Sequence, residues 1–284
     1  MTEHGETWLA VNSASGSHTE ERQHDLLTGL ARAGCTPARI VDVAHEDLPD
    51  AAALAAAGVG LYVVHGGDGT LNAALARAEG WQGKVLPLPG GTANLLCKTL
   101  HGEEADIAAI LAALAAGTLL VARRPCIRGH GWIALAEVLA GPGAAWADVR
   151  ETMRDGAVLD TVSGAIDAAA ASTAGPMVAL ARPALGREEG YAGLRFAPLR
   201  QGMRIDGYGA SELGDYFKQA LAILGRDFRA GPHDELGLHA EAACRMTEPV
   251  AIPLMVDGER REGGLEEQFS LAELAVDLFC RLDG

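Results

Sequence analysis

A polar, glycine-rich segment, HGGDGT at residues 65–70, lies between a run of apolar residues and a run of helix-forming residues. A turn of this kind offers unpaired backbone N–H groups and the positive end of a helix dipole to an anion, and glycine lets a phosphate approach the backbone closely. Thr70 and Asn72 add neutral donors at the start of the helix. The carboxylate of Asp68 would repel phosphate, but it suits a site where Mg²⁺ or an attacking hydroxyl must be oriented. The segment therefore predicts a phosphate-binding turn with a chemical role.

Two further polar turns, NSASGS at residues 12–17 and PGGTAN at residues 89–94, also follow apolar runs. In an open α/β sheet, the loops that follow parallel strands meet at one edge of the sheet, and ligands bind there. We therefore expect the three turns to lie along one edge. Neither of the usual nucleotide-binding patterns, GxxxxGK[ST] or GxGxxG, accounts for them.

The first 120 or so residues alternate short apolar runs with helical patterns, which is typical of parallel βαβ units. The expected strands are residues 7–12, 38–44, 60–65 and 84–89. The expected helices are residues 19–33, 47–58, 71–78, 92–100 and 104–117. This pattern predicts an open α/β nucleotide-binding domain over residues 1–123.

From about residue 118 onward, strand-like runs outnumber helical ones, which indicates an antiparallel sheet or sandwich. The expected strands are residues 118–127, 131–139, 176–181, 193–198, 203–209, 236–244, 250–256 and 274–280, and the expected helices are 144–154, 157–173 and 211–224. We therefore expect a second, β-rich, sandwich-like domain over residues 124–284. Its final segment either stays in that domain or returns to the first.

The composition limits the classes of partner. Apolar residues make up 49% of the chain, enough for a sizeable core, and the net charge of −15 argues against nucleic acid and against purely electrostatic binding to anionic membranes. Five arginines between residues 182 and 204 are the local exception, and they indicate a solvated surface or, alternatively, a patch that faces phosphates or lipid headgroups. The five cysteines are scattered without a CxxC pair, so we expect buried free thiols in a cytoplasmic protein.

Four ordered segments together resemble the diacylglycerol and sphingosine kinase family of lipid kinases, especially its small bacterial members. These segments are NSASG (12–16), GGDGTLNAAL (66–75), PGGTANLLCKTL (89–100) and VDGE (256–259). They resemble, in order, the family's NPxSG turn, GGDGTxNE loop, GTxNDFAR segment and terminal DGE motif. NAD kinases and phosphofructokinases share a GGDG-type loop, but the GTAN segment and the late DGE motif favour the lipid kinases. The resemblance extends over nearly the whole chain.

This resemblance implies a two-domain enzyme that uses ATP and Mg²⁺, with its active site in the cleft between the domains. It places ATP along Asn12, Ser13, Ala14, Ser15, Gly16, Gly66, Gly67, Asp68, Gly69, Thr70, Leu71, Asn72 and Thr92. It assigns an acid of the DGE motif as the general base that takes the proton from the lipid hydroxyl, with Glu259 the first candidate, Asp257 the second, and Asp68 as organiser of the metal or hydroxyl. It also implies a Mg²⁺ ion held by Asp206 with the carbonyls of Met203 and Tyr208.

The DGE motif also has a structural interpretation. Asp-Gly between two strands is a strong hairpin signal, and such a turn can itself orient the carboxylates. A carboxylate in a closing cleft can accept the proton of a hydroxyl during phosphoryl transfer, so the two interpretations are compatible.

The chain departs from the family pattern at four positions. Ser13 and Ser17 replace a proline and a lysine, and Ala73 and Leu95 replace a glutamate and an aspartate. These losses favour an alternative of another class, a regulatory protein that binds a nucleotide or lipid without transferring phosphate. The four acids Asp68, Asp206, Asp257 and Glu259 are retained, which favours the kinase.

The implied acceptor is a membrane lipid with a free hydroxyl, diacylglycerol by default, with a ceramide, a sphingoid base or phosphatidylglycerol as alternatives that the residues do not distinguish. We accordingly expect peripheral contact with the inner face of the membrane and no nucleic acid partner. A homodimer is left open.

Overall fold

The computed structural model describes residues 5–14, 19–91, 94–104, 106–145, 175–209 and 233–281. The chain divides into two compact units. Met1–Arg124 and Glu273–Gly284 form the first unit, and Pro125–Ala272 form the second. The last segment of the chain therefore belongs to the first unit.

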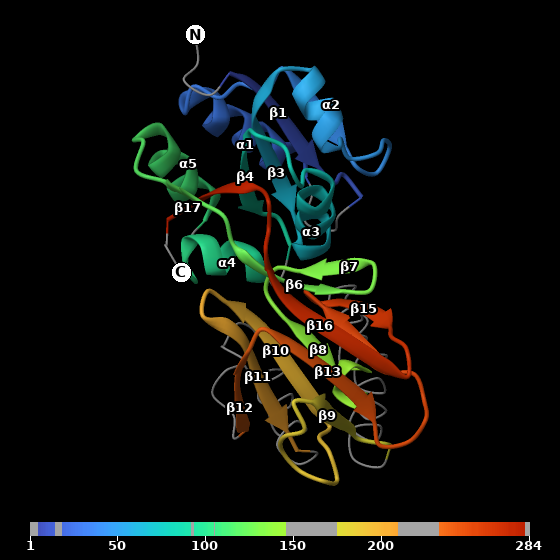
Figure 1. Cartoon of the computed structure of the whole chain (residues 1–284). Helices are drawn as coiled ribbons and strands as arrows, with labels where there is room; N and C mark the ends of the chain where they lie inside the picture. The colour runs from blue at the N-terminus through green and yellow to red at the C-terminus, as the bar shows by residue number, and fades with distance from the viewer. Residues whose placement is uncertain are drawn as a thin grey trace. The chain divides into compact units, whose positions relative to one another are not determined.

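The first unit is built on a six-stranded sheet with the order β2-β1-β3-β4-β17-β5 (Figure 1). Its strands are β1 (Glu6–Val11), β2 (Arg39–Asp42), β3 (Val59–Gly66), β4 (Lys84–Pro89), β5 (Leu120–Ala122) and β17 (Asp277–Cys280). The neighbouring strands from β2 through β17 pair in parallel, and only the edge strand β5 runs antiparallel to its neighbour. The expected open α/β sheet is confirmed.

The helices described in the first unit are α1 (Glu20–Arg32), α2 (Ala51–Ala56), α3 (Asp68–Arg77), α4 (Leu95–His101) and α5 (Ile107–Ala115). Three of them, α1, α2 and α5, begin where the sequence provides a side-chain cap. The side chains of Thr19, Asp50 and Asp106 each accept a hydrogen bond from a backbone amide three residues later. The helix α2 therefore begins at Ala51, four residues after the expected start, because the carboxylate of Asp50 accepts the hydrogen bond of a first-turn amide.

Helices cover both faces of this sheet (Figure 1). Leu61 and Val63 of β3 are fully buried in an apolar cluster with residues of α1 and α5. The neighbouring Tyr62 and Val64, also fully buried, point to the opposite face because side chains alternate along a strand, and α2 and α3 both contact β3. Because the side chains of β3 are buried on both faces of the sheet, the sequence of this strand is a nearly continuous run of apolar residues.

His101, the last residue of α4, is a buried titratable group of this core. Its Nε2–H donates to the carbonyl of Pro87 at 3.1 Å, and only 3% of the residue is exposed. The pKa of His101 is lowered to about 4, mainly by burial and also by the charge of Arg281, against the opposing effect of the Pro87 hydrogen bond. The imidazole is therefore neutral in the folded protein at neutral pH.

We expect the first unit to lose stability on acidification between pH 6.5 and 4. In that window the unfolded chain binds a proton at His101 that the folded protein excludes, so the free energy of unfolding is highest above pH 6.5 and falls by about 1.4 kcal/mol per pH unit below it. Denaturant unfolding at several pH values should show this slope and its loss in His101→Gln. His45→Gln, which changes an exposed histidine, should keep it; equal slopes in both variants would contradict the assignment.

The second unit contains two sheets of antiparallel strand pairs. One sheet has the order β12-β11-β10-β8-β14-β15 and the other β7-β6-β16-β13-β9. The strands are β6 (Pro125–Gly129), β7 (Trp132–Ala134), β8 (Val138–Ala140), β9 (Val178–Arg182), β10 (Gly193–Leu199), β11 (Gly202–Tyr208), β12 (Asp234–His239), β13 (Glu241–Met246), β14 (Pro253–Val256), β15 (Glu259–Glu262) and β16 (Glu266–Glu273), with a short 3₁₀ helix, η1, at Pro142–Ala145.

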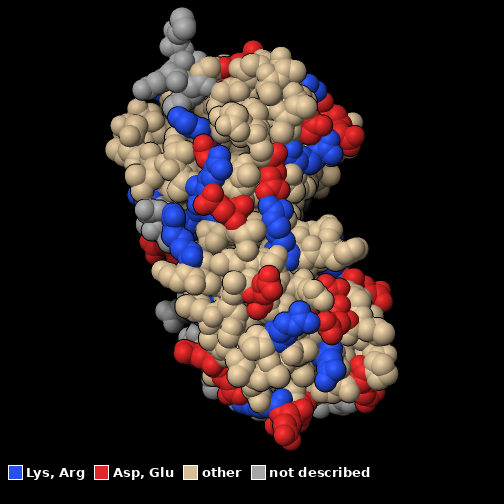
Figure 2. Space-filling model, in the orientation of Figure 1, with Lys and Arg blue, Asp and Glu red and all other residues tan. Residues whose placement is uncertain are grey.

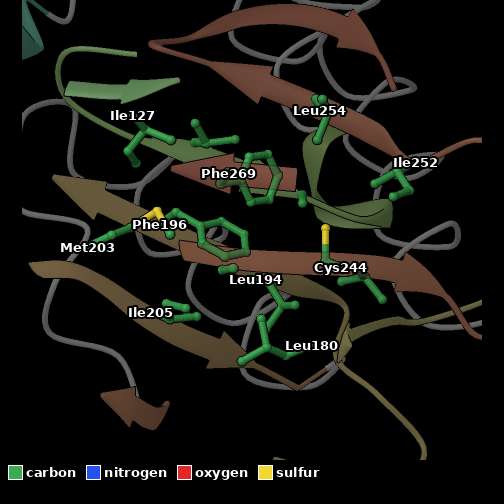
Figure 3. Close-up of a cluster of buried hydrophobic side chains, with 14 of the residues drawn as sticks. Ile127, Leu180, Leu194, Phe196, Met203, Ile205, Cys244, Ile252, Leu254 and Phe269 are labelled. Atoms are coloured by element: carbon green, nitrogen blue, oxygen red, sulfur yellow. The ribbon is translucent and has the colours of Figure 1, made fainter. Parts of the chain in front are cut away.

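One apolar core joins the two sheets of this unit (Figure 3). Phe196 of β10 and Phe269 of β16 lie in different sheets, and their ring centroids are 4.5 Å apart. Leu254 and Cys244 extend the same buried cluster along β14 and β13. The expected β-rich, sandwich-like organisation is confirmed.

Three strand-like segments are placed only by the tertiary structure. The final segment, with residues 274–280, was expected either in the second domain or back in the first, and β17 joins the first sheet beside β4. Residues 236–244 form two strands, β12 and β13, which lie in different sheets, and residues 118–127 divide between β5 and β6 in different units. Alternation of apolar residues identifies a strand but not the sheet it joins.

The cysteines are buried and free, as expected. The helices expected at 157–173 and 211–224, and nearly all of the one expected at 144–154, lie outside the described residues. Within the part of the chain that the structure describes, no helix has both the length and the apolar character needed to cross a membrane.

Candidate active site

The glycine turns of the first unit lie at one edge of its sheet. Val11 at the end of β1 pairs with His65 of β3, and Gly66 at the end of β3 pairs with Pro89 at the end of β4. The turns that begin at Asn12, Gly67 and Gly90 therefore follow neighbouring strands at their carboxyl ends, where ligands of such sheets bind. The expectation that the three turns share an edge is confirmed.

Close backbone packing explains the paired glycines. The amide of Gly90 donates to the carbonyl of Gly66 at 2.9 Å. A Cβ at Gly91 would lie 2.7 Å from the Cα of Gly67, and one at Gly90 would lie 2.9 Å from the Cα of Gly66. Gly90 and Gly91, which were not among the predicted site residues, are therefore needed to bring the two loops together. By contrast, a Cβ at Gly67 would meet Gly91 at an ordinary 3.5 Å.

This asymmetry predicts different outcomes for two alanine variants. Gly91→Ala forces a methyl group into the backbone of the facing loop and should lower the free energy of unfolding by about 1–3 kcal/mol. Gly67→Ala has room for its methyl group and a φ of −76°, so it should fold normally. Because this methyl group lies at the start of α3, it should weaken nucleotide binding. Thermal unfolding and titration with a fluorescent ATP analogue measure the two effects. Equal stability of the two variants would contradict the packing argument, and unimpaired nucleotide binding by Gly67→Ala would remove Gly67 from the site.

Two side chains hold the first turns of α3 and α4 in place. Asp68, the first residue of α3, accepts a hydrogen bond from the backbone amide of Leu96 in α4 at 3.1 Å. The side chain of Asn94, which has a left-handed backbone, accepts from the amide of Gly91 and donates to its carbonyl, both at 2.8 Å. Asp68 therefore connects the two glycine loops. Asn94 is a positioning residue that the sequence analysis quoted within its motif without assigning it a role.

The predicted nucleotide residues of the GGDG loop have different environments. Gly67 is the N-cap of α3 and has no side chain, so the positive end of the helix dipole is not covered by a capping side chain of that residue. Three residues near the start of the same helix are partly exposed: Gly69, Thr70 and Asn72. Leu71 differs, since its side chain is fully buried and its amide donates to the carbonyl of Gly67 at 3.0 Å. Leu71 therefore belongs to the core, and the prediction of a nucleotide contact there is not supported.

A residue outside the predicted set organises the turn after β1. Asp42, at the end of β2, accepts a hydrogen bond from the amide of Ser13 at 3.1 Å, and the side chain of Asn12 accepts one from the amide of Ala14 at 3.1 Å. Burial tends to raise the pKa of Asp42, but hydrogen bonds from Ser13 and Ala44 lower it below its usual value. The carboxylate thus stays ionised as an acceptor for this turn. Ser15, Gly16 and Thr92 lie outside the described residues.

In the second unit, the DGE motif forms a hairpin. Asp257 and Gly258 have φ angles of 47° and 88° and connect β14 to β15, with Val256 paired to Glu259. Two consecutive positive φ angles are typical of a type I′ turn, for which Asp-Gly is a preferred sequence. The predicted hairpin is confirmed.

The two acids of this hairpin have opposite environments. The carboxylate of Asp257 is buried, 4% exposed, and accepts hydrogen bonds from three backbone amides: Leu135 at 2.7 Å, Ala136 at 2.8 Å and Glu137 at 2.9 Å. Glu259 is exposed at the start of β15. Because three amide donors use the lone pairs of Asp257, this residue is a structural anchor and a poor candidate for a general base. Glu259 remains the candidate.

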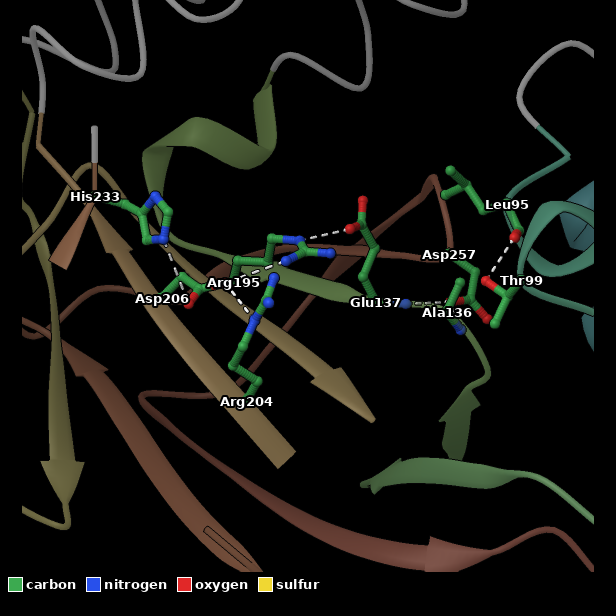
Figure 4. Close-up of polar contacts among 9 residues, drawn as sticks. All are labelled: Leu95, Thr99, Ala136, Glu137, Arg195, Arg204, Asp206, His233 and Asp257. Carbon is green, nitrogen blue, oxygen red and sulfur yellow. Dashed lines mark hydrogen bonds and ion pairs between the residues drawn. The ribbon is translucent and has the colours of Figure 1, made fainter. Parts of the chain in front are cut away.

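The residues expected to hold Mg²⁺ do not fit a metal site. The Oδ2 atom of Asp206 lies 3.1 Å from Nη1 of Arg195 and 3.1 Å from Nε of Arg204 (Figure 4). The carbonyl of Tyr208 accepts a hydrogen bond from Ala192 at 2.9 Å, and Met203 lies within the ladder between β10 and β12. Among the described residues, no three His, Cys, Asp or Glu side chains are grouped to bind a metal ion. Two guanidinium groups therefore neutralise the carboxylate on which the expected site depends.

The five arginines between residues 182 and 204 do not act as one free patch. Arg187 forms two hydrogen bonds to Asp234, at 2.8 and 3.1 Å, and Arg195 and Arg204 bind carboxylates of the same unit. On the face drawn in Figure 2, basic and acidic side chains are interspersed. Internal ion pairs thus use much of the positive charge that could have attracted a lipid headgroup.

A concave surface of about 600 Å³ occurs elsewhere in the first unit. Ala51, Ala55, Val59, Trp81 and Lys84 are among its lining residues. Val59 and Lys84 begin β3 and β4, so it lies at the edge of the sheet opposite the glycine turns. Its lining includes no carboxylate and none of the predicted site residues.

Comparisons with known proteins agree with this geometry. The family model described as "Diacylglycerol kinase catalytic domain" matches residues 6–123. A solved structure of a diacylglycerol kinase from Bacillus anthracis str. Sterne superposes with a TM-score of 0.63 at 18% identity, over 99% of this chain and 98% of that chain. Two further structures from the same organism, both assigned as diacylglycerol kinases, give TM-scores of 0.64 at 16% and 17% identity, with the same coverage. A comparison with curated proteins finds no match. At these identities the structures establish the fold alone. Residues 6–123 of this chain match the model of the diacylglycerol kinase catalytic domain, a match that implies a lipid kinase or a kinase-like enzyme.

Proposed function

We propose that this protein transfers the γ-phosphate of ATP to a free hydroxyl of a membrane lipid, with diacylglycerol as the first candidate acceptor. The observation that carries the proposal is the division of roles in the DGE hairpin. Asp257 is anchored by three backbone amides, and this anchoring fixes a turn from which the exposed Glu259 projects. A rigid turn that presents one exposed carboxylate is suited to accepting a proton from a bound hydroxyl.

ATP binding is supported by the donors at the edge of the first sheet. The turn at Asn12–Ala14, the glycines at 66 and 67, and the first turn of α3 lie at neighbouring strand ends, and α3 directs the positive end of its dipole to this edge. When bound, Mg²⁺ would neutralise the charge of the β- and γ-phosphates during transfer. Asp68 is our candidate for orienting the metal or the hydroxyl, because its hydrogen bond to Leu96 fixes the direction of its carboxylate.

Glu259 is our candidate for the general base. A hydroxyl gives up its proton as the loose transition state of phosphoryl transfer develops, and a nearby carboxylate can accept it. Glu259 is exposed to solvent, so water would have to be excluded around the bound substrate to strengthen its carboxylate as a base.

A ceramide, a sphingoid base and phosphatidylglycerol are alternative acceptors. A nucleotide- or lipid-binding regulatory protein is the alternative of another class, and the exposed Ala73 and the first residue of α4, Leu95, favour it, since both occupy positions where the family has an acid. Peripheral binding to the inner face of the membrane and a cytoplasmic location complete the proposal.

The proposal is tested by transfer of labelled γ-phosphate from ATP to mixed micelles, each containing one lipid of the panel. Mass spectrometry of the products identifies the acceptor. We expect labelled phosphatidic acid from diacylglycerol. Binding of ATP, measured separately, distinguishes the two classes: binding without transfer to any lipid supports the regulatory protein and overturns the kinase.

A further inference from the structure

Four charged side chains form a cluster on one face of the six-stranded sheet of the second unit (Figure 4). Arg195 of β10 lies at its centre, with Nε 2.7 Å from Oε2 of Glu137 and Nη1 3.1 Å from Oδ2 of Asp206. Arg204 of β11 approaches the same Asp206 oxygen at 3.1 Å. The side chains of Arg195, Glu137 and Asp206 are only 7%, 9% and 1% exposed.

The charges in this cluster balance. Two carboxylates face two guanidinium groups, and a buried charge is tolerated only when it is paired in this way. Burial alone would lower the pKa of Arg195, but Glu137, through its charge and hydrogen bond, and Asp206 raise it above the usual value. The guanidinium is thus held in its charged form. Among these four described side chains, a divalent cation would add two positive charges to a set that is already balanced.

The cluster is connected to the DGE hairpin through the backbone of Glu137. The Glu137 amide donates to the carboxylate of Asp257 at 2.9 Å, and the Asp257 amide donates to the Glu137 carbonyl at 2.9 Å. The side chain of Glu137 binds Arg195. Glu137 therefore links the two features: its side chain binds the guanidinium of Arg195, and its backbone binds Asp257 of the hairpin.

We propose that the Arg195 guanidinium takes the place of a divalent cation at Asp206, so that Glu137 and Asp206 are held together, and the DGE hairpin is positioned, without a bound metal. Arginine suits this role because its planar fork can contact two carboxylates at once, and because it cannot dissociate. Arg195 is in this sense a positioning residue. The inference does not depend on the proposed kinase activity.

The first test uses the nucleotide-free wild-type protein. After dialysis against buffer with MgCl₂ or MnCl₂ and removal of free ions, elemental analysis should find no metal retained per chain. The Tm of unfolding should be the same in EDTA as in millimolar Mg²⁺ or Mn²⁺. The atom that a metal would use is Oδ1 of Asp206, which lies 3.9 Å from Nε2 of His233. Retention of one metal ion per chain that is lost in Asp206→Asn would overturn the proposal.

The second test compares two matched variants. Arg195→Gln leaves Glu137 and Asp206 without their shared cation and should lower the Tm by about 10 °C. Millimolar Mg²⁺ or Mn²⁺ should restore part of this loss, because the variant now has a vacant site between two carboxylates. Arg204→Gln removes a guanidinium whose side chain is 38% exposed, and it should have a smaller effect with no response to metal. A Tm for Arg195→Gln that is unchanged, or lowered without any response to metal, would contradict the substitution of arginine for a cation.

If Arg195→Gln does not fold, the double variant Glu137→Gln/Arg195→Gln separates the effects, since it removes the carboxylate together with its partner. We expect the double variant to fold. Hydrogen exchange at the amides of residues 135–137 reports the positioning role, and it should be faster in Arg195→Gln than in Arg204→Gln. Equal exchange in the two variants would show that Arg195 does not position the hairpin.

Discussion

Glu259→Gln is expected to lower the rate of phosphoryl transfer from ATP to a lipid by roughly 10²–10⁴-fold, the usual contribution of a general base. Glutamine is close in shape to glutamate but cannot accept the proton of the hydroxyl. The loss should appear in kcat, because proton transfer belongs to the chemical step. Transfer of labelled γ-phosphate to diacylglycerol micelles under saturating ATP measures it.

The stability of this variant should not change. Glu259 is exposed, and among the described residues its side chain forms no ion pair or hydrogen bond that the substitution would break. Surface substitutions of this kind usually alter the free energy of unfolding by less than about 0.5 kcal/mol. Glu262→Gln is the matched control, since it makes the same change of charge on the same exposed strand, β15. An active wild type that loses no activity in Glu259→Gln would assign the base to another residue.

Asp257→Ala is expected to lower the free energy of unfolding of the second unit by about 3 kcal/mol or more. The substitution leaves the buried amides of Leu135, Ala136 and Glu137 without their acceptor, and each unsatisfied buried donor costs about 1–3 kcal/mol. Alanine also tolerates the positive φ of this position less well than aspartate. Denaturant unfolding measures the total loss, and hydrogen exchange at the three amides localises it.

Two further variants identify the cause of this loss. Asp257→Asn keeps one acceptor oxygen and a residue that adopts a left-handed backbone, so it should be less damaging than alanine. Glu259→Ala truncates the exposed acid of the same hairpin and should leave both the stability and the exchange of amides 135–137 unchanged. If Asp257→Ala and Glu259→Ala were equally stable, Asp257 would not be the anchor of the turn.

The two acids of the DGE motif illustrate what a local pattern can predict. The Asp-Gly dipeptide predicted the hairpin because the conformation of a two-residue turn depends on the turn residues themselves. The ranking of Glu259 above Asp257 came from the family resemblance. The reason for that ranking was absent from the local pattern, since the amide of Leu135 is 122 residues from the carboxylate it binds.

The same distinction applies to the glycine turns. Their order after successive apolar runs predicted a shared edge, because loops after parallel strands must emerge on the same side of a sheet. That Gly90 and Gly91 face Gly66 and Gly67 without room for a Cβ depends on the pairing of β3 with β4. The role of Asp42 as a hydrogen-bond acceptor for the turn after β1 is likewise visible only once β1 and β2 are paired.

By itself, the sequence determined the α/β and β-rich organisation, the glycine turns, the hairpin and the burial of the cysteines, because periodicity and turn chemistry act over a few neighbouring residues. Only the tertiary structure decided that β17 joins the first sheet, that Leu71 is a core residue and that Asp206 binds two arginines instead of standing open to a metal. These outcomes depend on how the strands and helices pair and pack in three dimensions. Such contacts are selected by the packing and charge balance of the whole unit, and no local pattern encodes them.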